Sequence, residues 1–115
     1  STGMIIFVFE FIIHAGVSPI SQKDGWYRKY LAGNALRFQG RLDEALSQYE
    51  QCLEYDDVEE PRVLCTMASV MNEKKDPSNA LQVYEHALQL DPEYPESYTG
   101  KAYTLLTLGQ YELAL

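Results

Sequence analysis

The chain has 115 residues, of which 46% are hydrophobic and 23% are charged, and its formal net charge at pH 7 is -8. This length and composition predict one small folded domain and exclude a disordered chain. No run of Lys or Arg is longer than two residues, which argues against a nucleic-acid partner because neutralising phosphates requires clustered cations. Two cysteines are too few for a disulfide framework, so we expect a reduced, cytoplasmic protein.

The segment Met4–Ile13 is apolar except for Glu10. A helix needs about 20 apolar residues to span a bilayer, and no basic residue precedes this run as in a secretory signal. Three interpretations of residues 4–25 remain open: a helix that packs on the next helix, a β-prone segment that pairs with a second copy, and a membrane or signal role. We expect residues 1–3 to be a cloning remnant.

Helical patterns then alternate with turn signals. Apolar residues recur with a period near 3.6 over residues 26–39, and Gly40 ends this helix because glycine adopts a left-handed cap at little cost. Asp43 is expected to cap a second helix, which runs to about Tyr55. We interpret the acidic segment Glu54–Glu60 as a solvated turn, with an acidic patch for a basic partner as the alternative.

Two further helices are predicted over Pro61–Glu73 and Pro77–Leu90, because proline presets the backbone angle of a first helical turn. Asp76 is expected to cap the second of them. A last helix begins at Pro95 and is expected to stop at Gly109. Its inward-facing residues are expected to be Tyr98, Ala102, Leu105 and Leu106.

Three alanines, Ala45, Ala80 and Ala114, lie 35 and 34 residues apart. Around the first and the third of them, the sequence reads GRLDEAL (40–46) and GQYELAL (109–115). A period of this length predicts a solenoid of stacked helix pairs. Such a stack provides a scaffold with a groove and does not by itself provide an active site.

Small residues recur where the helices of each pair would cross, because a larger side chain there would push the helices apart. They are Gly33, Ala45, Cys52, Ala68, Ala80, Ala87 and Ala102. Together with GNAL (33–36) and the two related seven-residue motifs, these columns resemble the tetratricopeptide repeat family over about residues 26–115.

The resemblance implies an all-α fold of antiparallel helix-turn-helix repeats, each a helix A followed by a helix B, in a right-handed superhelix (a TPR-like solenoid). The implied units are residues 26–60, residues 61–94 and a truncated third unit at 95–115. Residues 4–25 would then be a degenerate helix B or a cap.

In that family the A helices build a concave face on which extended peptides or partner helices bind. Carried over to this chain, the resemblance implies partner-binding residues on all three A helices. They are Tyr27, Tyr30, Asn34, Arg37, Phe38, Arg62, Cys65, Ser69, Asn72, Thr99 and Tyr103.

Some family members bind the acidic tails of chaperones through a clamp of Lys, Asn and further basic groups. Asn34 is present here, but the remaining clamp positions hold no cation. Those positions are Tyr30, Thr66, Glu96 and Gly100. Without cations the tail carboxylates would be desolvated and unpaired, so we do not expect chaperone-tail binding.

The sequence has no phosphate-binding glycine loop, nucleophile elbow or pair of catalytic carboxylates, so we expect no enzyme, cofactor or metal site. His14 and His86 have no partner at metal-ligand spacing, and we expect both to be structural or solvated. Cys52 falls in a packing column, whereas Cys65 lies toward the expected groove.

The function that this sequence favours is a protein-interaction scaffold that binds a peptide or partner helix on its concave face. The alternative is a structural or oligomerisation module, or a regulatory domain of a larger protein, with no peptide in the groove. We also expect self-association through residues 4–13 or through an open face at the last helix, because the end units of a solenoid need covering.

Overall fold

The structure is a computed structural model that describes residues 25–114. This part of the chain folds into α-helices, with no strand among the residues described. The helices are α2 (Gly25–Phe38), α3 (Leu42–Cys52), α4 (Glu60–Glu73), α5 (Pro77–Leu90) and α6 (Pro95–Ala114). The all-α repeat fold predicted from the sequence is confirmed. The predictions for residues 1–3, for His14 and for the segment 4–25 concern residues outside the described range, except for Gly25, which begins α2.

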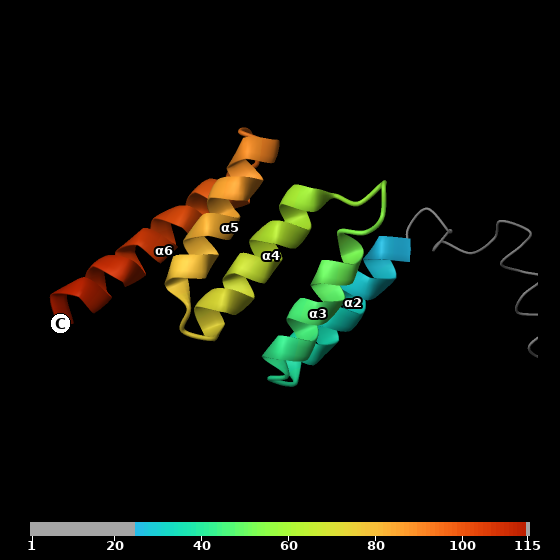
Figure 1. Cartoon of the computed structure of the whole chain (residues 1–115), viewed down its shortest axis with the longest axis horizontal. Helices are drawn as coiled ribbons and strands as arrows, with labels where there is room; N and C mark the ends of the chain where they lie inside the picture. The colour runs from blue at the N-terminus through green and yellow to red at the C-terminus, as the bar shows by residue number, and fades with distance from the viewer. Residues whose placement is uncertain (1–24, 115) are drawn as a thin grey trace, which may run out of the picture.

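The helices lie side by side as an antiparallel row (Figure 1). The turns at residues 39–41 and 74–76 lie along one edge of the row, and the connections at 53–59 and 91–94 lie along the opposite edge. α2 packs on α3, α4 packs on α5, and α6 packs on α5 and more lightly on α4. The predicted A and B helices therefore alternate in space as they do in the sequence.

The closest helix crossings are built from a glycine and a tyrosine. A β-carbon at Gly33 would lie 2.6 Å from Cε1 of Tyr49. A β-carbon at Gly100 would overlap the ring of Tyr84. The predicted column of small residues is buried at Ala45, Cys52, Ala68, Ala80 and Ala87. Ala102 was predicted to share this burial, but it is exposed.

Both turns from a helix A to a helix B use a left-handed residue. Gly40 has a φ of 81° and Lys75 has a φ of 66°. In the first turn the Arg41 N–H donates to the carbonyl of Leu36 at 2.9 Å, and the equivalent bond closes the second turn. Left-handed backbone costs a residue with a side chain roughly 1–2 kcal/mol. Lys75 therefore occupies a position that favours glycine.

Two capping predictions differ from the structure. Asp43 does not cap α3, because that helix begins at Leu42 and the Asp43 carboxylate forms an ion pair with Lys74 instead. Asp76 does precede α5 as its N-cap residue, but its Oδ2 accepts a hydrogen bond from the side-chain amide of Asn79 at 2.7 Å. Neither carboxylate therefore bonds to a helical N–H.

α3 also ends earlier than predicted, at Cys52 rather than near Tyr55. The N–H groups of residues 53–55 bond to carbonyls three residues back, which tightens the chain into a turn. The remaining predicted helix ends, apart from that of α6, agree with the structure to within one residue.

α6 differs most from its predicted form. It continues through Gly109, which does not adopt a left-handed φ and so does not end the helix. The buried side of α6 is formed by Ser97 and Thr104. The four residues predicted to face inward are exposed, namely Tyr98, Ala102, Leu105 and Leu106. A helix face is buried only where another helix covers it, and within residues 25–114 none covers this side of α6.

The two junctions between units are unequal. α5 and α6 share a much larger contact than α3 and α4, although both pairs join a helix B to the next helix A. The connection at residues 53–59 is also longer than the one at 91–94. The pair α2–α3 is therefore held to the rest of the row by less packing than α6 is.

We expect Gly33→Ala to lower the free energy of unfolding by about 1–3 kcal/mol, because the new methyl group would overlap a buried ring. The Tyr49 ring cannot swing aside, since it is fully buried and its hydroxyl is hydrogen-bonded. The matched control is Gly109→Ala, because nothing lies within 4 Å of a β-carbon at that position. This control should raise stability by up to about 1 kcal/mol, because it removes a glycine from a helix interior. Urea unfolding followed by circular dichroism measures both effects, and equal changes would contradict the packing described.

Candidate functional site

A hollow of about 600 Å³ lies between the A helices, with α2 on one side, α4 along its floor and α6 on the other side. α5 contributes one tyrosine to it, and the connection before α6 contributes another. The lining residues are Tyr30, Arg37, Arg62, Cys65, Thr66, Ser69, Tyr84, Tyr94, Pro95, Glu96, Thr99 and Gly100.

A second hollow of about 490 Å³ lies between α2 and α4 and shares three of these lining residues. It adds Asn34, Phe38 and Glu73. Because the two hollows share lining residues, they form one continuous surface, which we call the groove.

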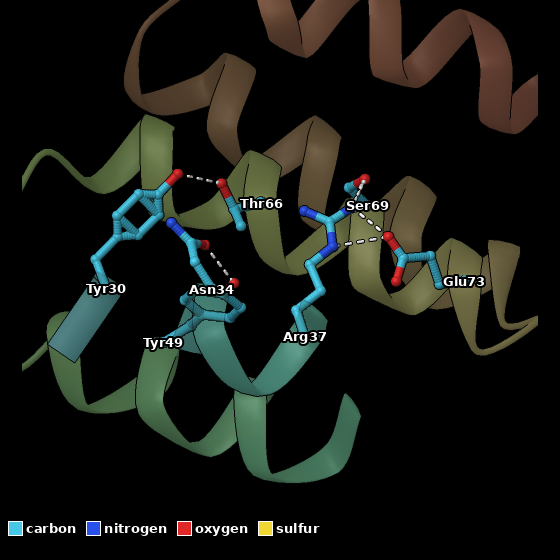
Figure 2. Close-up of polar contacts among 7 residues, drawn as sticks. All are labelled: Tyr30, Asn34, Arg37, Tyr49, Thr66, Ser69 and Glu73. Carbon is cyan, nitrogen blue, oxygen red and sulfur yellow. Dashed lines mark hydrogen bonds and ion pairs between the residues drawn. The ribbon is translucent and has the colours of Figure 1, made fainter. Parts of the chain in front are cut away.

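The side chains of α2 reach across the groove to α4 (Figure 2). The hydroxyls of Tyr30 and Thr66 are 2.8 Å apart. The Thr66 hydroxyl donates to the carbonyl of Arg62 at 3.0 Å, so Tyr30 is the donor in the first bond. This bond fixes one end of the α2–α4 junction.

Arg37 makes the second link between these helices. Its Nε donates to Glu73 Oε1 at 2.7 Å, and its Nη2 donates to the Ser69 hydroxyl at 2.8 Å (Figure 2). Burial acts to lower the pKa of Arg37, but the hydrogen bond and the charge of Glu73 outweigh it and raise that pKa. Glu73 therefore compensates the charge of Arg37, so this guanidinium is not an unpaired cation that could bind an anionic partner.

Below the groove, the hydroxyl of Tyr49 donates to Oδ1 of Asn34 at 2.6 Å. Burial raises the pKa of Tyr49 to about 12, because the phenolate form would lose its solvation. Asn34 is thus held by α3 from beneath. This hydrogen bond accounts for an asparagine at position 34 without a bound partner.

α4 is joined to α6 by a matching set of polar contacts. Sγ of Cys65 lies 3.2 Å from the hydroxyl of Ser97. The Asn72 side-chain N–H donates to Thr104 at 2.9 Å, while its buried Oδ1 has no hydrogen-bond partner among residues 25–114. An unsatisfied buried acceptor costs about 1–3 kcal/mol.

The residues expected to bind a partner fall into three groups. Six of them line the larger hollow: Tyr30, Arg37, Arg62, Cys65, Ser69 and Thr99. Asn34 and Phe38 line the second hollow, where Phe38 stands at the rim with 94% of its surface exposed. Asn72, Tyr27 and Tyr103 line neither hollow, although both tyrosines are exposed.

The sequence prediction missed several lining residues. Tyr84 lies on a helix B, whereas partner binding was expected on the A helices, and Tyr94 lies in a connection that the helical period does not cover. Thr66, Glu96 and Gly100 were considered only as clamp positions without a cation, yet all three line the larger hollow. The sequence did contain a signal for these three residues, because they lie on predicted A helices and the A helices were expected to build the concave face.

The groove offers polar recognition rather than reaction chemistry. Burial raises the pKa of Cys65, which works against a reactive thiolate. Among residues 25–114, no group of three or more His, Cys, Asp or Glu side chains is placed to hold a metal ion. His86 is exposed on α5, away from the groove lining. Across the same described residues, every helix is too short or too polar to cross a membrane.

Comparison with known proteins finds the same repeat throughout the described chain. One tetratricopeptide repeat model matches residues 28–58 and 61–94, and a second matches residues 83–115. No curated protein matches this chain.

We expect the stability of the protein to fall as pH rises from about 10 to 12, in part through Tyr49. In this range the unfolded chain loses the phenol proton while the folded chain keeps it, so unfolding becomes more favourable. Tyr49→Phe should remove this part of the alkaline decline. At neutral pH the same variant should be less stable by about 0.5–1.5 kcal/mol, because it loses the bond to Asn34. Thermal unfolding midpoints across pH measure both effects, and an unchanged alkaline slope would contradict the assignment.

Proposed function

Because the chain belongs to the tetratricopeptide repeat family, we propose that it is a non-catalytic scaffold that binds a peptide or helix of a partner protein in the groove. Repeats of this family generally mediate protein–protein interactions. The observation that carries the proposal is the hollow of about 600 Å³ whose lining comes from all three A helices.

The groove suits a partner segment that is polar or aromatic and not strongly anionic. Its lining contains the tyrosines Tyr30 and Tyr94, which are half-buried and offer part of their rings together with their hydroxyl groups, whereas the lining residue Tyr84 is buried. The guanidinium of Arg37 is already paired with Glu73, and Glu96 adds a second carboxylate to the lining. The net charge of -8 steers neutral or basic partners toward the chain more readily than acidic ones.

Hydrogen bonds between neighbouring A helices support this role because they restrict the positions of these helices before any partner arrives. Tyr30–Thr66 and Arg37–Ser69 join α2 to α4, and Asn72–Thr104 joins α4 to α6. A surface that is already ordered loses less conformational entropy on binding. These polar contacts thus preorganise the groove, and its more exposed residues are left for the partner.

The rival role is a structural or regulatory module that docks through its helix faces. Exposed apolar residues on α6 favour this role, namely Tyr98, Leu105 and Leu106. In this role, a second copy of the chain is one partner that could cover these α6 residues. The role also allows self-association through residues 4–13, which lie outside the described residues. We further propose unit boundaries at 26–60, 61–94 and 95–115.

A cytoplasmic location is also part of the proposal. Cys52 and Cys65 are free thiols, and both are buried. Reduced cysteines are the usual state in the cytosol.

The groove is tested with peptides selected from a random library for binding to the wild-type chain. Thr99→Trp places a large ring in the groove, and we expect it to weaken the selected peptides by roughly tenfold or more, because their site is blocked. Gln82→Trp is the matched control, since it adds the same ring at an exposed position of α5 that lines no part of the groove. Fluorescence anisotropy measures the affinities. Equal loss in both variants, or no loss in either, would contradict groove binding.

A further inference from the structure

A hollow of about 560 Å³ lies along the edge of the helix row where the units are connected (Figure 1). The connection at residues 53–59 and the first turn of α4 line one part of it, and the end of α5 and the connection at 91–94 line the other. Arg62 and Tyr94 also line the groove, whereas the remaining lining residues do not. Those residues are Val58, Glu59, Glu60, Pro61, Leu90 and Asp91. We call this site the edge hollow.

The apolar side chains of the edge hollow are accessible to a partner. Leu90 is 46% exposed, and Val58, Pro61 and Tyr94 are half-buried, so each of them shows part of its surface. Apolar residues scattered singly over a surface are ordinary, but these four come from two separate segments and line the same hollow. A concave apolar lining favours an apolar side chain as its occupant, because both lose contact with water there.

Negative charge is concentrated along the same edge. Residues 53–62 and 91–96 contain eight carboxylates and a single cation, Arg62. Residues 37–44 and 73–76, which lie along the opposite edge, contain four carboxylates and four cations. The formal net charge of -8 is therefore unevenly distributed, and the edge hollow lies in its most negative part. Such a field attracts positively charged partners.

Within the edge hollow, two of the three carboxylates remain without a cation. Glu59 forms an ion pair with Arg62 at 3.5 Å. Neither Glu60 nor Asp91 forms an ion pair among residues 25–114. The positive N-terminal end of α4 offsets part of the Glu60 charge, but Asp91 follows the negative C-terminal end of α5, whose last turn has no basic residue. A partner's cation would compensate this charge.

We propose that the edge hollow binds a segment of a basic partner protein in which a bulky aliphatic side chain is flanked by Lys or Arg. The aliphatic side chain fills the hollow against Leu90 and Tyr94, and the flanking cations lie near Glu60 and Asp91. A solvated acidic edge alone would attract any cation, so the apolar lining is what adds selectivity. This site does not depend on the function proposed for the groove.

A second copy of this chain is a poor occupant for the edge hollow. It carries the same net charge of -8, so like-charge repulsion opposes its approach to this edge. Several of its cations already form ion pairs with carboxylates of their own copy, namely Arg37, Arg41, Lys74 and Lys101. The occupant is therefore a different protein, and a basic one.

The test uses two labelled pentapeptides that are capped at both ends. One has a central leucine with two lysines on each side, and in the other a serine replaces the leucine. Fluorescence anisotropy with the full chain should show that the leucine peptide binds roughly fivefold or more tightly than the serine peptide. Leu90→Ser should abolish this preference, because the hollow loses its most exposed apolar side chain. Leu106→Ser is the matched control, since Leu106 is exposed on α6 outside the edge hollow, and it should keep the preference.

A second pair of variants tests the charges. Glu60→Gln should weaken both peptides by roughly threefold, because it removes a carboxylate of the hollow, and the effect should shrink as salt is added. Glu44→Gln makes the same change of net charge at the opposite edge and should leave both affinities unchanged. Circular dichroism checks that all variants remain folded, and Glu60→Gln keeps the proposal testable if Leu90→Ser does not fold.

Four outcomes overturn the proposal. The first is equal binding of the two peptides, and the second is a preference for leucine that Leu90→Ser leaves intact. The third is loss of binding in Thr99→Trp, which would place the peptides in the groove. The fourth is sedimentation of the chain alone as a dimer that Leu90→Ser dissociates, because a second copy would then occupy the hollow. Leu90→Ser should leave the library peptides of the groove unaffected, so failure of this proposal and failure of groove binding are distinguishable.

Discussion

The fit of a tyrosine ring into the space above a glycine sets the spacing of the helices, and the groove follows from that spacing. Tyr49 does this against Gly33 within the first unit, and Tyr84 does it against Gly100 across the boundary between the second and third units. Tyr49 and Tyr84 occupy the same position of the repeat, yet one packs within a unit and the other packs between two units. A glycine at either place is required by contact with an aromatic ring and not by backbone conformation, because Gly33 and Gly100 lie inside α-helices.

Hydrogen bonds between polar side chains add to this packing, and they determine which polar groups of the groove remain for a partner. Tyr30, Arg37, Ser69 and Asn72 are all engaged with a neighbouring helix. The same residue types that a family resemblance assigns to partner binding therefore also hold the A helices together. A partner can still use their remaining surface, but any substitution at these positions changes the scaffold together with the contact.

Much of the fold could be predicted from the sequence because the repeat carries local signals at fixed intervals. The columns of Ala45 and Ala80 and the prolines at Pro61, Pro77 and Pro95 locate the helices and their starts. Sequence reasoning failed where a residue depends on a distant neighbour. Gly109 was expected to end a helix as Gly40 does, yet it is helical, and the left-handed residue of the second turn is Lys75. The bonds Tyr30–Thr66 and Arg37–Glu73 join residues 36 positions apart, and their formation depends on helix spacing that no local pattern encodes.

The unequal junctions between units give the row of helices an uneven stiffness. α4, α5 and α6 form a well-packed block, whereas α2 and α3 form an arm attached through the smaller α3–α4 contact and side chains such as Arg37 and Lys74. Bending and twisting should therefore concentrate at this one joint. A segment that spans the whole groove would therefore restrict motion at one joint rather than at two, because the part of the groove between α4 and α6 is already held by packing.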